Sequence, residues 1–352
     1  MKNRTGIALL MFIATPLWAG SAKKAPPDVE LQKQGRKVLW EQPADIASRD
    51  LMSGQGGREH FPASGATYEF VKEDLGATNP KFTVRDAQGG KWKIKLGDEA
   101  RPETVATRFV WAVGFHTDED YFLPQVRVSG LPEHVHRGQN FIDADGTMHN
   151  ARLEKEPDDE KKLGIWRWSD GPFTGTREWN GLRVMMALVN NWDLKDENNT
   201  VYEIREKGIK HQRDPGLSQK EDPELIYVVS DLGAAFGPVR LDLARKSDKG
   251  DLTKFRHTTF IRRVHADRVD FAVPGAPSAF FIFNPAEYFR RRRLMWIGKN
   301  VPRDDARWIG SVLAQLSPAQ IRDAFRAGGY PPEQVEAFAS ILQSRIRDLS
   351  EL

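Results

Sequence analysis

Hydrophobic and polar positions first alternate with a period of two, beginning near residue 67. This alternation predicts four short strands, at 68–71, 82–85, 92–96 and 121–128. In the third of them Trp92, Ile94 and Leu96 face one side, and lysines occupy the positions between. The turn-forming residues 86–90 predict a hairpin that joins the second strand to the third.

A helix is predicted between the third and fourth of these strands, from about residue 103 to residue 115. Its apolar residues Val105, Phe109 and Val113 fall on one stripe at helical spacing, and Pro102 favours the start of a helix. This order of elements predicts a small antiparallel sheet that carries one helix. The polar residues 129–164 then predict a connector or insertion.

The pattern becomes mainly helical beyond residue 165. Leu182, Met185 and Val189 recur at helical spacing and predict a buried face on a helix over 179–190. Two short strands are expected next, at 200–204 and 225–229. The charged stretch 205–223 between them predicts an exposed loop.

Helix signals also mark the C-terminal residues 301–352. Ser317 and Gln320 have the spacing of a capping box, with Pro318 at the first helical position. Gly328 and Gly329 are expected to end that helix. A last helix is predicted over 332–349.

The first residues predict export. Lys2 and Arg4 precede an apolar stretch that is too short to span a bilayer, and small residues then offer a cleavage site near residue 22. Residues 1–22 are therefore interpreted as a signal peptide, with an uncleaved anchor or a chance apolar start as the alternatives. The chain has no cysteine, which excludes structural disulfides and a lipid-modified cysteine. We expect a periplasmic or secreted protein of a bacterial envelope.

Composition excludes several broad classes. The 352 residues are 39% hydrophobic and 29% charged, values that rule out wholesale disorder and a multi-span membrane protein. The formal net charge is only +3, and Lys2 and Arg4 of the leader contribute to it. No nucleic-acid partner is therefore expected. Residues 23–50, rich in Lys, Pro and Gln, predict an arm or linker.

The loop 191–199 carries the first candidate chemistry. It contains Asp193, then Lys195 two positions later and Asn198 five positions later. In phosphoryl transfer a carboxylate meets the attacking hydroxyl, a cation meets the transferred phosphoryl, and an amide oxygen helps to hold a metal ion. A polar loop that merely follows a helix is the alternative interpretation.

A second acidic residue follows the strand at 225–229. If this strand pairs with the one at 200–204 as a hairpin, Asn198 and Asp231 lie at the same end of the pair. An amide and a carboxylate placed together suit Mg²⁺ that is held by few protein oxygens and by phosphates. An isolated Asp-Leu-Gly sequence is otherwise a common turn.

The small sheet supplies a cation. Lys95 ends the third strand and Glu103 opens the next helix, so that a lysine able to contact nucleotide phosphates could be oriented by a helix carboxylate. Lys93 faces the same side of the strand and Glu99 is also near. Both remain alternatives for this pair.

Together these motifs resemble the protein-kinase-like superfamily. The strand lysine, the helix glutamate, the loop Asp193-Leu194-Lys195 with Asn198, and Asp231-Leu232-Gly233 occur in the order typical of that superfamily. The tail of the last motif is similar to atypical members: secretory-pathway kinases of the Golgi casein-kinase type, HipA-like kinases and phosphoinositide kinases. The resemblance covers roughly residues 67–290.

The resemblance implies an α+β, two-lobed protein-kinase-like fold, with a small antiparallel sheet plus one helix, a larger mostly helical lobe and a helical C-terminal extension. The expected boundaries are 1–22 for the signal peptide, 23–50 for the arm, 51–128 for the N-lobe, 129–164 for the connector, 165–300 for the C-lobe and 301–352 for the extension.

It also implies a role for each site residue. Lys95 would bind the α and β phosphates of ATP, and Glu103 would orient it. Asp193 would be the catalytic base and Lys195 a γ-phosphate contact. The metal ligands for Mg²⁺ or Mn²⁺ would be Asn198 and Asp231.

The chain departs from the superfamily pattern in three places. Asn191-Trp192 stand where His-Arg is usual before the catalytic aspartate, and the gap from Asn198 to Asp231 is long. No glycine-rich phosphate loop precedes the second strand. The loop 72–80 would have to cover the phosphates through Gly76, Thr78 and backbone N–H groups.

Three further motifs are interpreted as structural first. Residues 143–146 are expected to form a surface turn rather than a calcium loop, and His134 with His136 a solvated loop rather than a zinc site. The four arginines 290–293 predict a solvated helix face, with weak contact to an anionic surface as the functional alternative.

Two main hypotheses result. The first is an exported, metal-dependent phosphotransferase that moves the ATP γ-phosphoryl to a hydroxyl of a protein, glycan or lipid acceptor. The second is a catalytically inactive kinase-like binding or scaffold protein, favoured by the missing glycine loop and by an envelope poor in ATP. An exported protein of another class, whose motifs match by chance, is a third.

Overall fold

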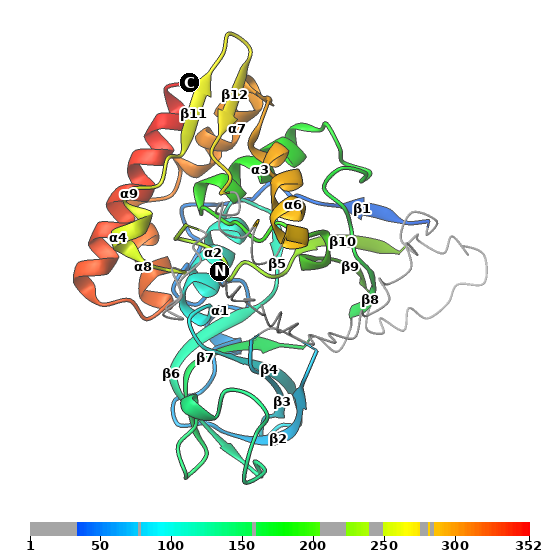
Figure 1. Cartoon of the computed structure of the whole chain (residues 1–352), viewed down its shortest axis with the longest axis vertical. Coiled ribbons are helices and arrows are strands. Elements are labelled where there is room, and N and C mark those ends of the chain that lie inside the picture. Colours follow the sequence, from blue (N-terminus) through cyan, green and yellow to red (C-terminus); the bar gives the residue numbers. More distant parts are fainter. Residues whose placement is uncertain are drawn as a thin grey trace, which may run out of the picture.

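The computed structural model describes residues 34–76, 79–156, 160–204, 223–238, 249–274, 281 and 285–352. The predicted signal peptide lies outside these residues, and so does the charged stretch 205–223 apart from its last residue. Figure 1 shows a barrel at one end of the molecule and a larger body of sheets and helices at the other.

A closed five-stranded barrel forms the smaller part. Its strands, in barrel order, are β2 (Thr67–Asp74), β3 (Lys81–Arg85), β4 (Lys91–Leu96), β7 (Thr147–Lys155) and β6 (Asp120–Ser129). Neighbours pair antiparallel, except that β6 closes the barrel by pairing parallel with β2. Alternate residues of these strands fill the interior, among them Phe82, Ile94 and Leu153, all buried.

A second sheet crosses the larger body. It has the order β1 (Arg36–Val38), β10 (Glu224–Val229), β9 (Asn199–Ile204) and β8 (Glu160–Gly164), and the short β5 (His116–Thr117) also pairs with β10. Strands β9 and β10 pair antiparallel with Asn199 opposite Val229. The predicted hairpin pairing of these two strands is therefore confirmed.

A third, three-stranded sheet lies at the far end of the larger body. It consists of β11 (Ile261–Val264), β12 (Arg268–Phe271) and β13 (Val301–Pro302). Short helical turns connect other parts of the chain: α1 (Gly57–His60), α4 (Leu252–Phe255), and the 3₁₀ turns η2 (Gln139–Phe141), η3 (Asp196–Asn198) and η4 (Met295–Gly298).

The longer helices of the larger body pack mainly on one another. They are α2 (Ala100–Ala112), α3 (Arg177–Leu188), α6 (Pro285–Leu294), α7 (Arg303–Leu313), α8 (Pro318–Ala327) and α9 (Pro332–Ser350). The capping box of Ser317 and Gln320 is present at the start of α8, as predicted.

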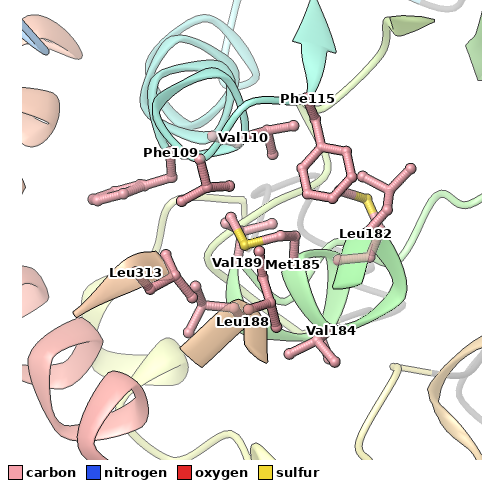
Figure 2. Packing of buried hydrophobic residues seen from close by; sticks show 14 of the residues in the cluster. Phe109, Val110, Phe115, Leu182, Val184, Met185, Leu188, Val189 and Leu313 are labelled. Carbon is pink, nitrogen blue, oxygen red and sulfur yellow. The ribbon is translucent and has the colours of Figure 1, made fainter. Parts of the chain in front are cut away.

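The main core lies where α2 meets α3. Figure 2 shows Phe109 and Val110 of α2 above Met185 and Val189, with Leu313 of α7 close by. All five side chains are fully buried. Helix α2 also contacts β6 and β7, so that it forms the wall shared by the barrel and the larger body.

The two-lobed kinase-like fold expected from the sequence is wrong. The strands predicted as a small antiparallel sheet belong to a closed barrel with one parallel pair, and the larger body contains two further sheets rather than being mostly helical. Helices α8 and α9 pack on the main core, where Phe325 and Phe338 contact Phe236. The chain is a mixed α/β protein.

The polar segment 129–164 and the arm 23–50 also differ from expectation. The first contains β7 and β8, and β7 completes the barrel. The polar pattern of this segment predicted a connector because buried positions are normally apolar. Arg152, however, is a buried barrel residue, only 2% exposed. In the second, residues 36–38 form β1 at the edge of the second sheet.

One glycine allows the close packing of α7 on α9. A Cβ at Gly310 would lie 2.7 Å from the Cβ and 3.2 Å from the carbonyl carbon of Leu349. Alanine is normally favoured over glycine inside a helix by about 0.5–1 kcal/mol. At position 310 the clash with Leu349 outweighs this preference for alanine. We therefore expect Gly310→Ala to lower the free energy of unfolding by about 1–3 kcal/mol in urea titrations.

The matched control for this change is Ser311→Ala at the next, exposed position of α7. It should alter the free energy of unfolding by less than about 0.5 kcal/mol. A Gly310→Ala protein as stable as the wild type would show that α7 and α9 are not in close contact there.

Candidate functional site

A buried lysine forms the centre of the candidate site. Lys95, near the end of β4, is only 1% exposed. Its Nζ lies 2.8 Å from Oε2 of Glu103 and 3.1 Å from Oδ1 of Asp231, and it also contacts Glu99. The structure thus brings together the lysine, the helix glutamate and the second acidic residue that the sequence predicted, which come from three separate elements.

Local structure explains how these groups meet. Glu99 and Glu103 lie one turn apart at the start of α2, directly after the turn that leaves β4. Asp231 lies two residues after Val229, the last residue of β10. A Cβ at Gly233 would lie 2.8 Å from the Cβ of Glu99 and 3.0 Å from Oε2 of Glu103. Only glycine therefore lets the chain after Asp231 pass so close to α2.

Electrostatics favours a charged lysine. Burial alone would lower the pKa of Lys95, but the carboxylates of Asp231, Glu103 and Glu99 outweigh it and raise that pKa well above its usual value. For Asp231, the effect of Lys95 outweighs burial and holds the pKa of the carboxyl well below its usual range. Burial alone would raise the pKa of Glu99, but Lys95 and Lys249 lower that pKa to about 2.

Glu103 behaves differently. It is 1% exposed, and complete burial raises its pKa to about 7, although Arg152 and Lys95 oppose the shift. The Nε of Arg152 lies 3.2 Å from Oε2 of Glu103, and its Nη1 lies 3.5 Å from Oδ2 of Asp120. Arg108 reaches the same aspartate at 3.6 Å. Glu103 is thus the junction between the site and a buried ionic network beneath α2.

The predicted loop lies beside Asp231. The backbone carbonyl of Asn198 accepts hydrogen bonds from the backbone N–H groups of Ser230 at 2.9 Å and of Asp231 at 3.4 Å. The side-chain amide of Asn198 donates to the backbone carbonyl of Asp193. Lys195 Nζ lies 2.8 Å from Oδ2 of Asp193. The hairpin of β9 and β10 therefore places Asn198 next to Asp231, as the sequence predicted.

The sequence reasoning missed three residues of this region. Trp192 lies between two cations, with Lys249 5.4 Å and Arg291 4.4 Å from the ring centroid. Arg291 also approaches Oδ1 of Asp193 at 3.8 Å. The four arginines 290–293 predict a solvated helix face, and nothing in that local pattern shows that Arg291 turns toward the loop while the other three are exposed.

Several alternatives are resolved by the geometry. Lys93 contacts Glu154 at 3.1 Å and Glu156 at 3.2 Å, away from the Lys95 cluster. The exposed Gly76 donates its N–H to Asp74 within its own turn. Thr78 lies outside the described residues, so the predicted phosphate contact there stays a prediction.

The two discounted metal motifs lie on the surface. His136 contacts Glu73 at 3.1 Å on an exposed loop, and residues 143–146 form a turn closed by the N–H of Gly146 on the carbonyl of Asp143. By contrast, Glu99, Glu103 and Asp231 each offer a carboxylate oxygen within 4.8 Å of the others. Lys95 contacts all three carboxylates, Lys249 also pairs with Glu99, and Arg152 also pairs with Glu103. Asp231 is the most exposed member, at 35% for the side chain.

An adjacent carboxylate and amide fit a hard divalent cation such as Mg²⁺ or Mn²⁺. The backbone N–H of Asp231 is hydrogen-bonded to the carbonyl of Asn198, so the two residues lie side by side after β10 and before β9. These are the residues that could hold such an ion, which would supply positive charge to phosphate oxygens.

The comparisons with known proteins add no relative. No family model, no curated protein and no solved structure matches the chain. Among the described residues, no helix has the length and apolar character needed to cross a membrane.

Removal of the charged group of Lys95 should lower the free energy of unfolding. Lys95→Met would leave three carboxylates close together without their shared partner, and loss of one member of a buried ionic group typically costs about 3–5 kcal/mol. We expect a loss of that size in the free energy of unfolding, measured in urea. Lys93→Met is the matched control on the same strand, and its part-exposed ion pairs should contribute less than about 1 kcal/mol. Equal losses would contradict the central position of Lys95.

A pH test addresses the network beneath the site. Burial, and then the nearby Glu154, raise the pKa of Asp118 to about 8, although Arg152 and Lys93 oppose the shift. The folded state then holds this proton to a higher pH than the unfolded chain, so the free energy of unfolding falls as pH rises from about 4 to about 8.

Asp118→Asn cannot ionise, and we expect its free energy of unfolding to fall less steeply across that window. Urea titrations at several pH values measure the difference between the two proteins. The exposed Asp267→Asn serves as the control and should follow the wild type. Parallel curves for Asp118→Asn and wild type would contradict the raised pKa.

Proposed function

We propose that the chain is an exported, metal-dependent phosphotransferase that transfers the γ-phosphoryl of ATP to a hydroxyl of a protein, glycan or lipid. The observation that carries this proposal is the buried Lys95 held by Glu103 and Asp231, with the Asp193 loop hydrogen-bonded beside Asp231. Cation, carboxylates and amide are the groups that phosphoryl transfer requires. The proposal rests on these residues and not on a kinase fold.

Each side chain has a task in the proposed reaction. Lys95, kept charged by its carboxylates and oriented by Glu103, would bind the α and β phosphates. Asp231 and Asn198 would hold Mg²⁺ or Mn²⁺, which offsets phosphate charge. Asp193 would accept the proton of the acceptor hydroxyl while that oxygen bonds to the γ-phosphorus and the bond to the ADP oxygen breaks. Lys195 would contact the transferred group.

Arg291 is a further residue with a place in the proposed reaction. Its guanidinium stacks on Trp192 and lies near Asp193, and its side chain is only 10% exposed. Together with Lys195 it surrounds the proposed base with two cations. Both would attract phosphate oxygens toward Asp193.

The same contacts support the second candidate, an inactive binding or scaffold protein of the cell envelope. Asp193 is already paired with Lys195, and a base held in an ion pair is less able to accept a proton. An envelope location, proposed from residues 1–22, would also supply little ATP. Nucleotide binding without turnover is the behaviour expected of this candidate.

Nucleotide binding and turnover distinguish the candidates. With ATP and Mg²⁺ or Mn²⁺ at about 100 times Kd, we expect ligand binding to raise the free energy of unfolding by about 2.7 kcal/mol, seen as a rise in Tm. Asp231→Asn should abolish the metal-dependent part of this rise, each variant being compared with its own ligand-free melt. Asp267→Asn, on an exposed turn, should keep it.

Turnover is measured as ADP release with a mixture of hydroxyl-bearing acceptors. Asp193→Asn should still bind ATP but lose activity by about 10²–10⁴-fold, the usual contribution of a general base. Binding without any turnover in the wild type would favour the scaffold candidate. No shift with any nucleotide or metal would overturn the phosphotransferase and leave the scaffold candidate.

A further inference from the structure

A second polar pocket lies at the N-terminal end of α2, outside the Lys95 cluster. It has a volume of about 630 Å³ and is bounded by the start of α2, Asn150 of β7, the segment 249–253 and the start of α9. The side chains with polar groups that matter here are Arg101, Lys249, Tyr330, Asn150, Gln334 and Asp98. Its size is within the range of small-molecule sites.

Arg101 is a cation of this pocket that has no ion-pair or hydrogen-bond partner among the described residues. Its guanidinium carbon lies 5.2 Å from the ring centroid of Phe122 and 5.9 Å from that of Tyr330. Within the part of the chain that the structure describes, it makes no ion pair or hydrogen bond through its side chain. Two aromatic rings therefore hold a guanidinium whose N–H donors remain for a ligand.

Tyr330 provides an independent observation. The residue is only 8% exposed, and its hydroxyl has no hydrogen-bond partner among the described residues. The hydroxyl lies against Gly250 on the pocket wall, where a Cβ would come within 2.3 Å of it. Burial raises the pKa of Tyr330 well above its usual value, so the hydroxyl keeps its proton. A buried donor without an acceptor is unfavourable, and a small shift of the covering Gly250 would let an anionic ligand satisfy it.

The remaining groups indicate what else the ligand carries. Lys249 already contacts Glu99, and the carboxylate of Asp251 accepts a hydrogen bond from the backbone N–H of Lys254. Asn150 and Gln334 contribute amides that both donate and accept, as hydroxyl groups require. The exposed carboxylate of Asp98 is a further acceptor for hydroxyl protons.

We propose that this pocket binds a small hydroxyl-rich molecule with one anionic group, a sugar phosphate or a sugar acid, whose anion contacts Arg101 and the Tyr330 hydroxyl. Phosphate and carboxylate share the bidentate geometry that a guanidinium recognises. The inference does not depend on phosphoryl transfer. Lys249 lines this pocket and also lies over Trp192 of the candidate site. The pocket and the candidate site therefore adjoin.

Isothermal titration without ATP or metal tests this pocket. The probes are glucose 6-phosphate, glucuronate, glucose and inorganic phosphate. We expect the phosphorylated or carboxylated sugar to bind at least about tenfold more tightly than glucose or inorganic phosphate, because each of these lacks half of the recognised groups. The stronger of the two charged sugars identifies the anionic group.

Variants assign the binding to the pocket. Arg101→Gln should weaken the charged sugar about tenfold or more, and Tyr330→Phe, which removes only one hydroxyl, should weaken it about threefold or more. Arg127→Gln is the matched control, because Arg127 lies on the barrel surface beside Asp145 and should leave binding unchanged. Melting curves confirm that each variant is folded.

Two results would overturn the inference: no heat of binding for either charged sugar at millimolar concentration, or equal affinity in wild type, Arg101→Gln and Tyr330→Phe. Asp231→Asn, which should lose metal-dependent ATP binding, should keep the charged sugar. An absence of sugar binding in this pocket and an absence of phosphotransferase activity are therefore separate outcomes.

Discussion

A positive charge removed from water must be neutralised where it lies, and Lys95 imposes this requirement on the whole molecule. Its Nζ is buried among Glu99, Glu103 and Asp231. The lysine belongs to the barrel, the glutamates to α2, and the aspartate to the chain after β10. The ionic contacts therefore tie barrel, helix and second sheet together, and Gly233 allows the close approach that they need.

Helix α2 serves three neighbours at once. Phe109 and Val110 on one side belong to the main core, and its first turn presents Glu99 and Glu103 to Lys95. Between these glutamates, Arg101 turns toward the pocket with Tyr330. Because successive helix residues point in different directions, a single turn supplies both the ionic cluster and the second pocket.

Arg152 extends the ionic contacts into the barrel. Its guanidinium reaches Glu103, Asp120 and Glu154, and it is as buried as the apolar residues around it. Such a network gives a defined geometry only when every member has a partner. Ionic contacts, rather than apolar packing alone, thus join β7 to α2 and place the barrel against the site.

The sequence alone determined the local elements and most of the candidate site. Periodicity identified the main strands and helices, and residue type with spacing identified Lys95, Glu103, Asn198 and Asp231. Tertiary structure decided the barrel closure and the placement of β7, since the ion pairs that bury Arg152 leave no apolar signal. It also decided that Arg291, Lys249 and Tyr330 adjoin these sites, because contacts between residues far apart in the chain have no periodicity to read.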